Sequence, residues 1–413
     1  MRVKKQDLEM KLLFINSAYP VDCYDQIQKD AQGLLQVPSD VFQWAVIDGL
    51  ERKGVDYTLA CTPALPAWPR YRRLFTPSGE MMVEGKARGH YLRYCTAPIL
   101  NQMTWKYALR SYVRKWCINN ANEDKLVVIC YTQQADRLGA GVELKKRFPN
   151  LVVAPIVTDL IDNAMDFAAN RTFAKRIQVR LEKRAERKLF PKVDKFVLLT
   201  RQMTECIPEA ADKYMVMEGI ASWDSIAPRA PLAKSEDIRS LLYTGTFQEF
   251  GGLRMLVDAF LKTKDPRFRL VLCGQGVLRE YVEKAASADS RIIYKGLVSH
   301  EDVVRLQRES TMLINPRRPN GGITKYSFPS KTMEYMSSLT PMIGYHLEGI
   351  PKEYYPFMYT PKDLTEESLT ECINDTLSLP LDVLQQKANN AFRFVAHNKN
   401  SIEQVRRMIE FLT

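Results

Sequence analysis

The stretch "SLLYTGT" at residues 240–246, followed by "GLRMLVDAFLK" at 252–262, decides the fold of the second half of the chain. The first run is short, apolar and ends in a glycine turn, which is typical of a buried strand. The second run has its apolar residues at helical spacing. A strand, a glycine turn and a helix in this order predict the start of a doubly wound sheet.

The same order repeats along the chain on both sides of this stretch. Downstream, buried strands are expected at 267–274, 291–296, 311–316 and 340–345, with helices between them. Upstream, strands are expected at 11–16, 56–61, 125–130, 151–156 and 195–200, with helices such as 39–54 and 135–148. Continuous apolar strands that alternate with helices predict parallel sheets covered on both faces.

Residues 221–239 separate the two halves. They are rich in Pro, Ser and Ala and have no hydrophobic period, so we interpret them as a linker. The expected fold class is therefore α/β, with two doubly wound Rossmann-like domains, 1–220 and 240–395, facing a cleft. Ligands of such sheets bind beyond the carboxyl ends of the strands.

Composition limits the class of protein. The 413 residues are 46% hydrophobic and carry a net charge of +11, which favours a polyanionic partner: nucleic acid, anionic lipid or a phosphorylated ligand. Without a zinc-finger or RNP pattern, nucleic acid is the least favoured of these. The eight cysteines are scattered without a C-x-x-C pair, which predicts reduced thiols and neither a zinc site nor a disulfide framework. With no secretory signal and no apolar run of membrane-spanning length, a cytoplasmic location is expected.

Glycine-containing loops follow several of the second-half strands. They are "TGT" (244–246), "GQG" (274–276) and "PRRPNGG" (316–322). Glycine lets the backbone approach a ligand closely, and a helix that begins after such a loop offers its first amides to phosphate. Gly245, Thr246, Gly274 and Gly276 are therefore candidate ligand-binding residues.

The segment "FPSKTMEYM" (328–336) carries a cation and a carboxylate at a predicted helix start. A helix that begins near Pro329 leaves the amides of Ser330, Lys331 and Thr332 unpaired, so that they and the side chains can bind a diphosphate. Glu334 lies one turn further on, where it can accept hydrogen bonds from sugar hydroxyls. The alternative needs no ligand: Ser330 caps the helix and Glu334 favours its first turn.

Four stretches then resemble one known family. "LLYTGTFQEFGGLRMLVDAF", "LVLCGQGVLREYVEKA", "IIYKGLVSHEDVVRLQRESTMLINPR" and "FPSKTMEYMSSLTPMIGY" come in the order and spacing of GT-B glycosyltransferases, over residues 240–350. The resemblance is to the retaining family 4 (group 1) enzymes that build bacterial capsule, O-antigen or exopolysaccharide. It implies a nucleotide-sugar donor in the second domain, an acceptor in the first, and a final helix (396–413) that returns to the first domain.

The resemblance also assigns roles to residues. Glu334 corresponds to the glutamate that binds ribose, the backbone from Phe328 to Thr332 holds the diphosphate, and Leu297 and Val298 lie where the base is contacted. With the loop residues above, the implied donor-binding set is Gly245, Thr246, Gly274, Gly276, Leu297, Val298, Lys325, Tyr326, Phe328, Ser330, Thr332 and Glu334.

Three positions depart from the family pattern. Tyr326 stands where the first glutamate is usual, Thr246 where an arginine is usual, and glycine at 251 or 252 where a lysine is usual. The leaving diphosphate needs positive charge, and the chain has no Asp-x-Asp pair to hold a metal. We therefore expect metal-independent chemistry without a cofactor, in which Lys331 and Arg317, flanked by Arg318 and Lys325, supply the charge.

The first half carries fewer candidates. Ser17, in the loop after the first strand, and Gly33 are expected to contact the acceptor. Asp159 directly follows the strand at 151–156, at a strand end where related enzymes place a group that contacts sugar or acceptor; a helix cap or turn residue is the alternative. Asp159, Lys331 and Arg317 are thus the candidate catalytic residues.

The helix predicted within 173–192 is the most basic of the chain. Ile177, Leu181, Ala185 and Leu189 form one apolar stripe, interpreted as facing the core below a solvated basic surface. The alternative is contact with anionic lipid or a lipid diphosphate, joined by "RYRRLF" (70–75).

Together these features predict a cytoplasmic hexosyltransferase, peripheral on the inner face of the membrane. It would move a sugar from a nucleotide-sugar, UDP-linked, to a glycan acceptor carried on polyprenyl diphosphate. Two alternatives stay open: a nucleotide-sugar epimerase of the same fold, and a degenerate subunit that binds a partner enzyme.

Overall fold

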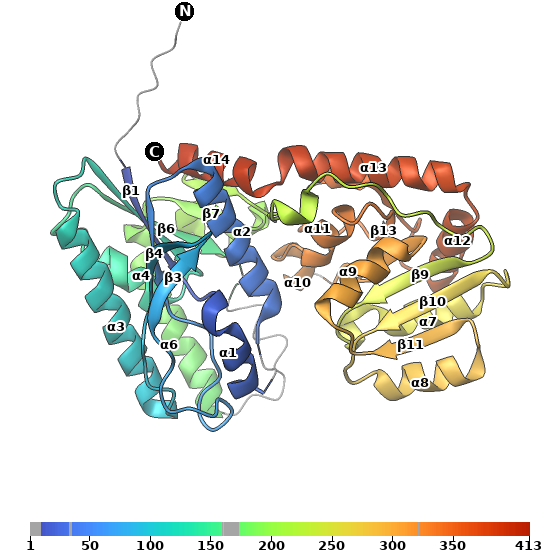
Figure 1. Cartoon of the computed structure of the whole chain (residues 1–413), viewed down its shortest axis with the longest axis horizontal. Helices are drawn as coiled ribbons and strands as arrows, with labels where there is room; N and C mark the ends of the chain where they lie inside the picture. The colour runs from blue at the N-terminus through green and yellow to red at the C-terminus, as the bar shows by residue number, and fades with distance from the viewer. Residues whose placement is uncertain (1–9, 33–34, 159, 161–172, 321) are drawn as a thin grey trace, which may run out of the picture. The chain divides into compact units, whose positions relative to one another are not determined.

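The structure is a computed structural model that describes residues 10–32, 35–158, 160, 173–320 and 322–413 (Figure 1). The chain divides into two compact units. Unit 1 consists of Met1–Ser222 together with Ser401–Thr413, and unit 2 consists of Trp223–Asn400. The chain therefore enters unit 2 once and comes back to unit 1 at Ser401.

Unit 1 is built on an eight-stranded sheet in which the described neighbours are parallel except for the edge pair β3–β4. Across the sheet the strands are β3 (Gly79–Val83), β4 (Lys86–Tyr91), β2 (Tyr57–Cys61), β1 (Met10–Asn16), β5 (Lys125–Tyr131), β6 (Leu151–Val157), β7 (Phe196–Leu198) and β8 (Tyr214–Val216). The helices are α1 (Tyr24–Asp30), α2 (Val37–Lys53), α3 (Pro98–Asn119), α4 (Ala135–Val142), α6 (Phe173–Leu189) and α14 (Ser401–Leu412). The five strands expected in the first half are confirmed.

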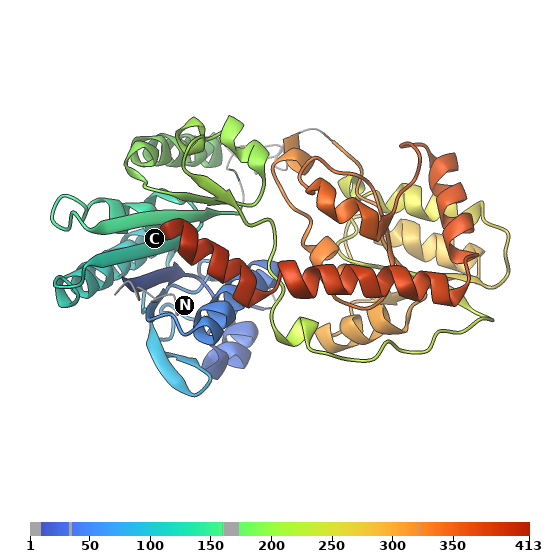
Figure 2. The ribbon, with the colours of Figure 1, turned by 90° about the horizontal axis from the view of Figure 1, so that it is seen from above.

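The last helix, α14, is part of the unit 1 core and packs along α2 (Figure 2). The two helices approach so closely that a Cβ on Gly49 would lie 2.3 Å from the Ser401 carbonyl oxygen. The Ser401 hydroxyl donates to Asp48, and Gln404 Nε2 donates to the Gly219 carbonyl at 2.6 Å. Residues from both ends of the sequence therefore complete one unit.

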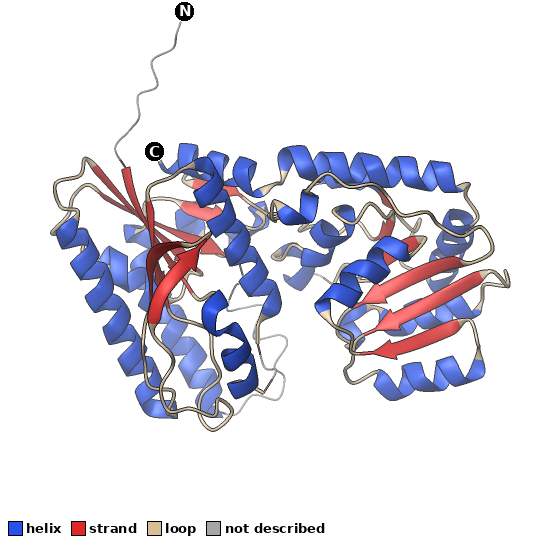
Figure 3. Ribbon diagram, in the orientation of Figure 1, coloured by secondary structure: helices blue, strands red, loops and turns tan. Residues whose placement is uncertain are grey.

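Unit 2 is built on a six-stranded parallel sheet. Its strands, across the sheet, are β11 (Ile292–Gly296), β10 (Phe268–Cys273), β9 (Arg239–Thr244), β12 (Met312–Asn315), β13 (Met342–Gly344) and β14 (Met358–Tyr359). Its helices are α7 (Leu253–Leu261), α8 (Arg279–Ala288), α9 (His300–Glu309), α10 (Gly322–Lys325), α11 (Ser330–Met336), α12 (Glu366–Leu377) and α13 (Leu381–Asn398). Helices cover both faces of each sheet, with α9 in front of the unit 2 strands and α7 behind them (Figure 3). The expected doubly wound α/β fold is confirmed.

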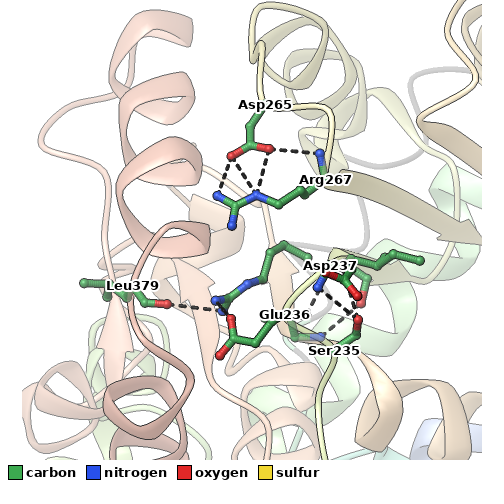
Figure 4. A network of polar contacts seen from close by, with 10 residues as sticks. Ser235, Glu236, Asp237, Asp265, Arg267 and Leu379 are labelled. Carbon is green, nitrogen blue, oxygen red and sulfur yellow. Dashed lines mark hydrogen bonds and ion pairs between the residues drawn. The ribbon is translucent and has the colours of Figure 1, made fainter.

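A polar network anchors β9, the first strand of unit 2 in the sequence (Figure 4). Arg239, the first residue of β9, is buried; it donates to the Leu379 carbonyl at 3.2 Å and pairs with Glu236. Ser235 Oγ accepts the amide of Asp237 at 3.2 Å, so the residues before the strand form a tight turn. The unpatterned segment before residue 239 therefore ends in a fixed attachment to the sheet.

The expectation that the apolar stripe of α6 faces the core is wrong for Ile177 and Leu181, whereas Ala185 and Leu189 are partly buried. Ile177 and Leu181 have 42% and 59% of their surface exposed. The helix instead buries Val179 and Glu186, and Glu182 Oε1 accepts the Ala135 amide at 3.0 Å. A carboxylate is favourable at the positive N-terminus of α4. Glu182 shares a face of α6 with Val179 and Glu186, and Ile177 and Leu181 lie off that face.

Among the helices that the structure describes, none has a long enough apolar stretch to span a membrane.

Candidate functional site

The strand order of unit 2 locates its ligand-binding edge. The chain proceeds from β9 to β10 and β11 in one direction, and then returns to place β12 on the other side of β9. The carboxyl ends of β9 and β12 are therefore the topological switch point, where doubly wound sheets bind ligands. The loops from Gly245 and from Pro316 begin there.

Two glycines allow these loops to pack together. Gly252, at the N-terminus of α7, has φ +78°, and a Cβ there would lie 2.1 Å from the Pro316 carbonyl oxygen. Gly274 has φ +141°, and a Cβ there would lie 1.8 Å from the Gly245 carbonyl oxygen. Neither position accepts a side chain without moving backbone, so the loops after β9, β10 and β12 form one edge. Position 252 therefore has no room for the lysine that is usual at 251 or 252.

Lys331 projects from α11 to the end of β9. A Cβ on Gly245 would lie 2.8 Å from Lys331 Cε, and Lys331 Nζ is 3.5 Å from Thr244 Oγ1. Nζ also lies 5.7 Å from the centre of the Tyr335 ring, one helical turn on. Among the described residues, no carboxylate forms an ion pair with Lys331, although it is only partly exposed. The switch point thus holds a cation without a protein counter-ion in the part of the chain that is described.

Tyr335 and Tyr243 fix the surroundings of this ammonium group. The Tyr335 ring is fully buried, and its hydroxyl accepts the Thr244 amide at 3.3 Å. The Tyr243 hydroxyl donates to the Thr246 carbonyl at 3.0 Å. Burial raises the pKa of Tyr243 to about 12, an effect that the Lys331 charge opposes, and burial also raises the pKa of Tyr335. Both phenols therefore stay neutral; Tyr335 holds the end of β9 against α11, and Tyr243 holds the loop that follows β9.

The beginning of α11 lies where the sequence predicted, but it offers fewer amides. The helix starts at Ser330 after Pro329, and no side chain caps it, so the capping role considered for Ser330 is wrong. The Thr332 amide donates to the Pro329 carbonyl at 2.9 Å, which corrects the expectation that three amides are unpaired. The Thr332 hydroxyl is buried and has no hydrogen-bond partner among the described residues.

Glu334 has a protein partner that the sequence did not reveal. Gln307, buried in α9, donates a hydrogen bond from Nε2 to Glu334 Oε1. This contact fixes one carboxylate oxygen and leaves the partly exposed carboxylate with further acceptor capacity. Gln307 is thus a positioning residue for Glu334.

The other candidates of unit 2 surround this edge. Arg317 Nη2 lies 3.5 Å from Ser327 Oγ, and Lys325 Nζ lies 5.6 Å from the centre of the Tyr326 ring. Leu297, after β11, is 67% exposed, and Val298 is partly exposed. The Phe328 side chain packs against Tyr354, with ring centres 5.4 Å apart, so only its backbone is available to a ligand.

The unit 1 candidates are less fully placed. Asp159 and Gly33 lie outside the described residues. Ser17 is buried, and both its amide and its hydroxyl donate to Gln43 Oε1, at 2.6 and 3.2 Å. Over the described residues, no three His, Cys, Asp or Glu side chains gather in a group that could hold a metal ion.

Comparison with known proteins identifies the fold. Residues 238–378 match the family described as glycosyl transferases group 1. No curated protein matches the chain by sequence. Among solved structures, the chain is similar to sucrose-phosphate synthase from Thermosynechococcus elongatus, with 14% identity over 97% of this chain and 98% of that one and a TM-score of 0.64.

Two further structures are similar over nearly the whole chain. HepE from Anabaena, in complex with UDP, has 13% identity over 98% of this chain and 99% of that one, with a TM-score of 0.59. WaaG, a glycosyltransferase involved in lipopolysaccharide biosynthesis, has 13% identity with the same coverage and a TM-score of 0.53. The chain thus has the GT-B fold, and its second unit carries the sequence pattern of the group 1 glycosyl transferases.

Proposed function

We propose that this protein is a glycosyltransferase that moves a hexosyl group from a UDP-sugar to a glycan acceptor, with retention at the anomeric carbon. The family match over residues 238–378 and a fold shared with a structure that holds UDP support a nucleotide-sugar donor. The observation that carries the proposal is the Lys331 ammonium group at the switch point, beside Gly245 and without an ion-pair partner in the described part of the chain.

In this proposal the diphosphate lies between the Gly245 loop and the start of α11. Departure of UDP places negative charge on the diphosphate, and a fixed cation in a partly buried site lowers the energy of that transition state. Lys331 supplies this charge, and Arg317, on the loop after β12, adds to it.

Glu334 accepts the ribose hydroxyls in this arrangement. The hydrogen bond from Gln307 holds the carboxylate in one orientation before the donor arrives, so less conformational entropy is lost on binding. Tyr326 replaces the glutamate that usually holds the donor sugar, so we propose that other groups position that sugar.

The proposal is tested with donor alone and then with acceptor. Isothermal titration with UDP is expected to show binding, and mass spectrometry is expected to show sugar transfer in the presence of a chelator. Binding without transfer to any acceptor, but with interconversion of the nucleotide-sugar, would identify an epimerase instead. Absence of UDP binding would leave the degenerate-subunit alternative.

We further propose that the acceptor is lipid-linked, in bacterial surface polysaccharide synthesis, and that unit 1 contacts an anionic membrane. The outward face of α6 combines Ile177 and Leu181 with the exposed Arg180 and Arg184. Apolar side chains among cations suit the interface of an anionic bilayer. The wild-type protein is expected to sediment with anionic vesicles. The double variant Arg180→Glu, Arg184→Glu is expected to stay in the supernatant. Equal sedimentation of the wild type with neutral vesicles would contradict membrane binding through these cations.

A further inference from the structure

Unit 1 contains a pocket whose lining includes none of the proposed donor-binding residues. It lies between the loop after β1 and the helices α1 and α2, and its volume is about 350 Å³. This volume is within the range of ~300–1,000 Å³ found for ligand pockets. Its lining consists of three aromatic rings, one valine and two carboxylates: Tyr19, Val21, Tyr24, Asp25, Asp40 and Trp44.

Hydrogen bonds hold the pocket walls in place. The Tyr19 amide donates to Asp40 Oδ1 at 2.8 Å, and Trp44 Nε1 donates to the Tyr19 carbonyl at 3.2 Å. The Tyr19 hydroxyl donates to the Ala64 carbonyl at 2.9 Å, and the Tyr24 ring packs edge-on against the Tyr19 ring. Because the polar end of the Trp44 indole is engaged, the pocket presents the apolar part of that ring.

The charge of the pocket is opposite to that of the chain as a whole. Asp40 and Asp25 are its charged groups, and burial without a compensating cation raises the pKa of Asp40 to about 6. Apart from the Tyr19 amide, no donor among the described residues is bonded to the Asp40 carboxylate. An ionised carboxylate has about four acceptor positions, so it can take further donors from a ligand.

These features select the chemistry of the ligand. A phosphate group is repelled by two carboxylates in a partly buried site. A pyranose ring suits the pocket, because its polarised C–H bonds meet the negative faces of Trp44 and Tyr24 while its hydroxyl or amino groups donate to Asp40.

We propose that this pocket binds an unphosphorylated sugar unit of the acceptor, an inference that rests on the proposed glycosyltransferase function. A diphosphate carried by the acceptor would then lie outside the pocket. Asp40 and Trp44, rather than Ser17 with its hydroxyl bonded to Gln43, are the residues that recognise the sugar.

Saturation-transfer NMR on the full chain tests the proposal with methyl α-glucopyranoside, glucosamine and glucose 6-phosphate as probes. Saturation is expected to pass from the protein to methyl α-glucopyranoside, to glucosamine or to both, and not to glucose 6-phosphate. Asp40→Asn keeps an acceptor for the Tyr19 amide, so it should fold, yet it should weaken binding about tenfold, as should Trp44→Ala. Tyr107→Ala, which removes an exposed ring of α3, is the matched control and should change nothing.

Three results would overturn the proposal. They are no saturation transfer to either unphosphorylated probe, transfer in the Asp40 and Trp44 variants equal to that in the wild type, or transfer to glucose 6-phosphate comparable with that to the unphosphorylated probes. UDP titration of the same samples separates the two ideas. Loss of UDP binding with intact sugar binding would refute the proposed function, whereas intact UDP binding without sugar binding would refute the pocket.

Discussion

Replacement of Lys331 by methionine tests the source of positive charge at the donor site. Methionine keeps the length of the side chain that packs over Gly245, so the change removes the charge with little loss of packing. A cation about 4 Å from a phosphate oxygen is worth ~4 kcal/mol at an effective dielectric constant of about 20, and ~1 kcal/mol in water. Because Lys331 is partly exposed, we expect a loss between these limits.

This range corresponds to a fall in kcat/KM of about fivefold to a thousandfold. The fall should appear mainly in kcat, because charge builds up on the diphosphate in the transition state. The assay is initial-rate release of UDP at several donor concentrations. Lys284→Met, at an exposed position of α8, is the control and should retain full activity.

A second substitution sharpens the test. A Cβ on Gly251 would meet only the Tyr243 hydroxyl at 3.7 Å and the Thr246 carbonyl at 3.9 Å, which are ordinary contacts. Gly251→Lys therefore fits, and it should restore part of the activity lost in Lys331→Met. A loss below about fivefold in the single variant, roughly 1 kcal/mol, would refute the reasoning, as would an equal loss in Lys284→Met.

Three further predictions concern other parts of the chain. Glu334→Gln should raise the Kd of UDP about tenfold, and Gln307→Leu should raise it less, both measurable by calorimetry; unchanged affinity in both variants would remove Glu334 from the site. Gly252→Ala should lower the free energy of unfolding by ~2 kcal/mol or more, seen in denaturant titration, because the new Cβ strains a positive φ and meets the Pro316 carbonyl. Burial raises the pKa of Glu186 to about 8 from 4.5. Since the folded state then binds more protons than the unfolded state, stability falls as pH rises from about 4.5 to about 8, by at most ~5 kcal/mol. Glu186→Gln removes this loss of stability. The Tm of the variant minus the Tm of the wild type should therefore increase from about pH 5 to about pH 9, and a Tm difference that does not change with pH would contradict the burial effect.

Most strands of both sheets could be predicted because their signal is local; besides β3 and β4, the short edge strands β8 and β14 were missed. Runs such as 125–130 and 240–246 are apolar without alternation, and parallel sheets buried on both faces require that pattern. The edge pair β3–β4 gave no such signal, because buried residues are few in it and the strands include the charged Glu80, Lys86 and Arg88. The glycine loops were predictable for a related reason, since close backbone approach leaves few alternatives to glycine.

Side-chain partners were not predictable, because they depend on how elements distant in sequence pack. The contact of Gln307 with Glu334 spans 27 positions and exists only because the fold brings these two residues of α9 and α11 together. The error at α6 has the same origin. Its apolar residues recur at helical spacing, but the packed face carries Val179, Glu186 and the contact of Glu182 with α4, which the periodicity of α6 does not encode.

The packing of α14 on α2 has a consequence for the order in which the protein is made. Unit 2 is a continuous segment, so it can fold as soon as its own residues have left the ribosome. Unit 1 is translated first, yet its α2 face around Gly49 stays uncovered until residues 401–413 are made. Chains released early, before residue 401, should therefore hold a folded second unit beside a first unit with an open apolar face. Such chains are the ones expected to aggregate or to engage chaperones.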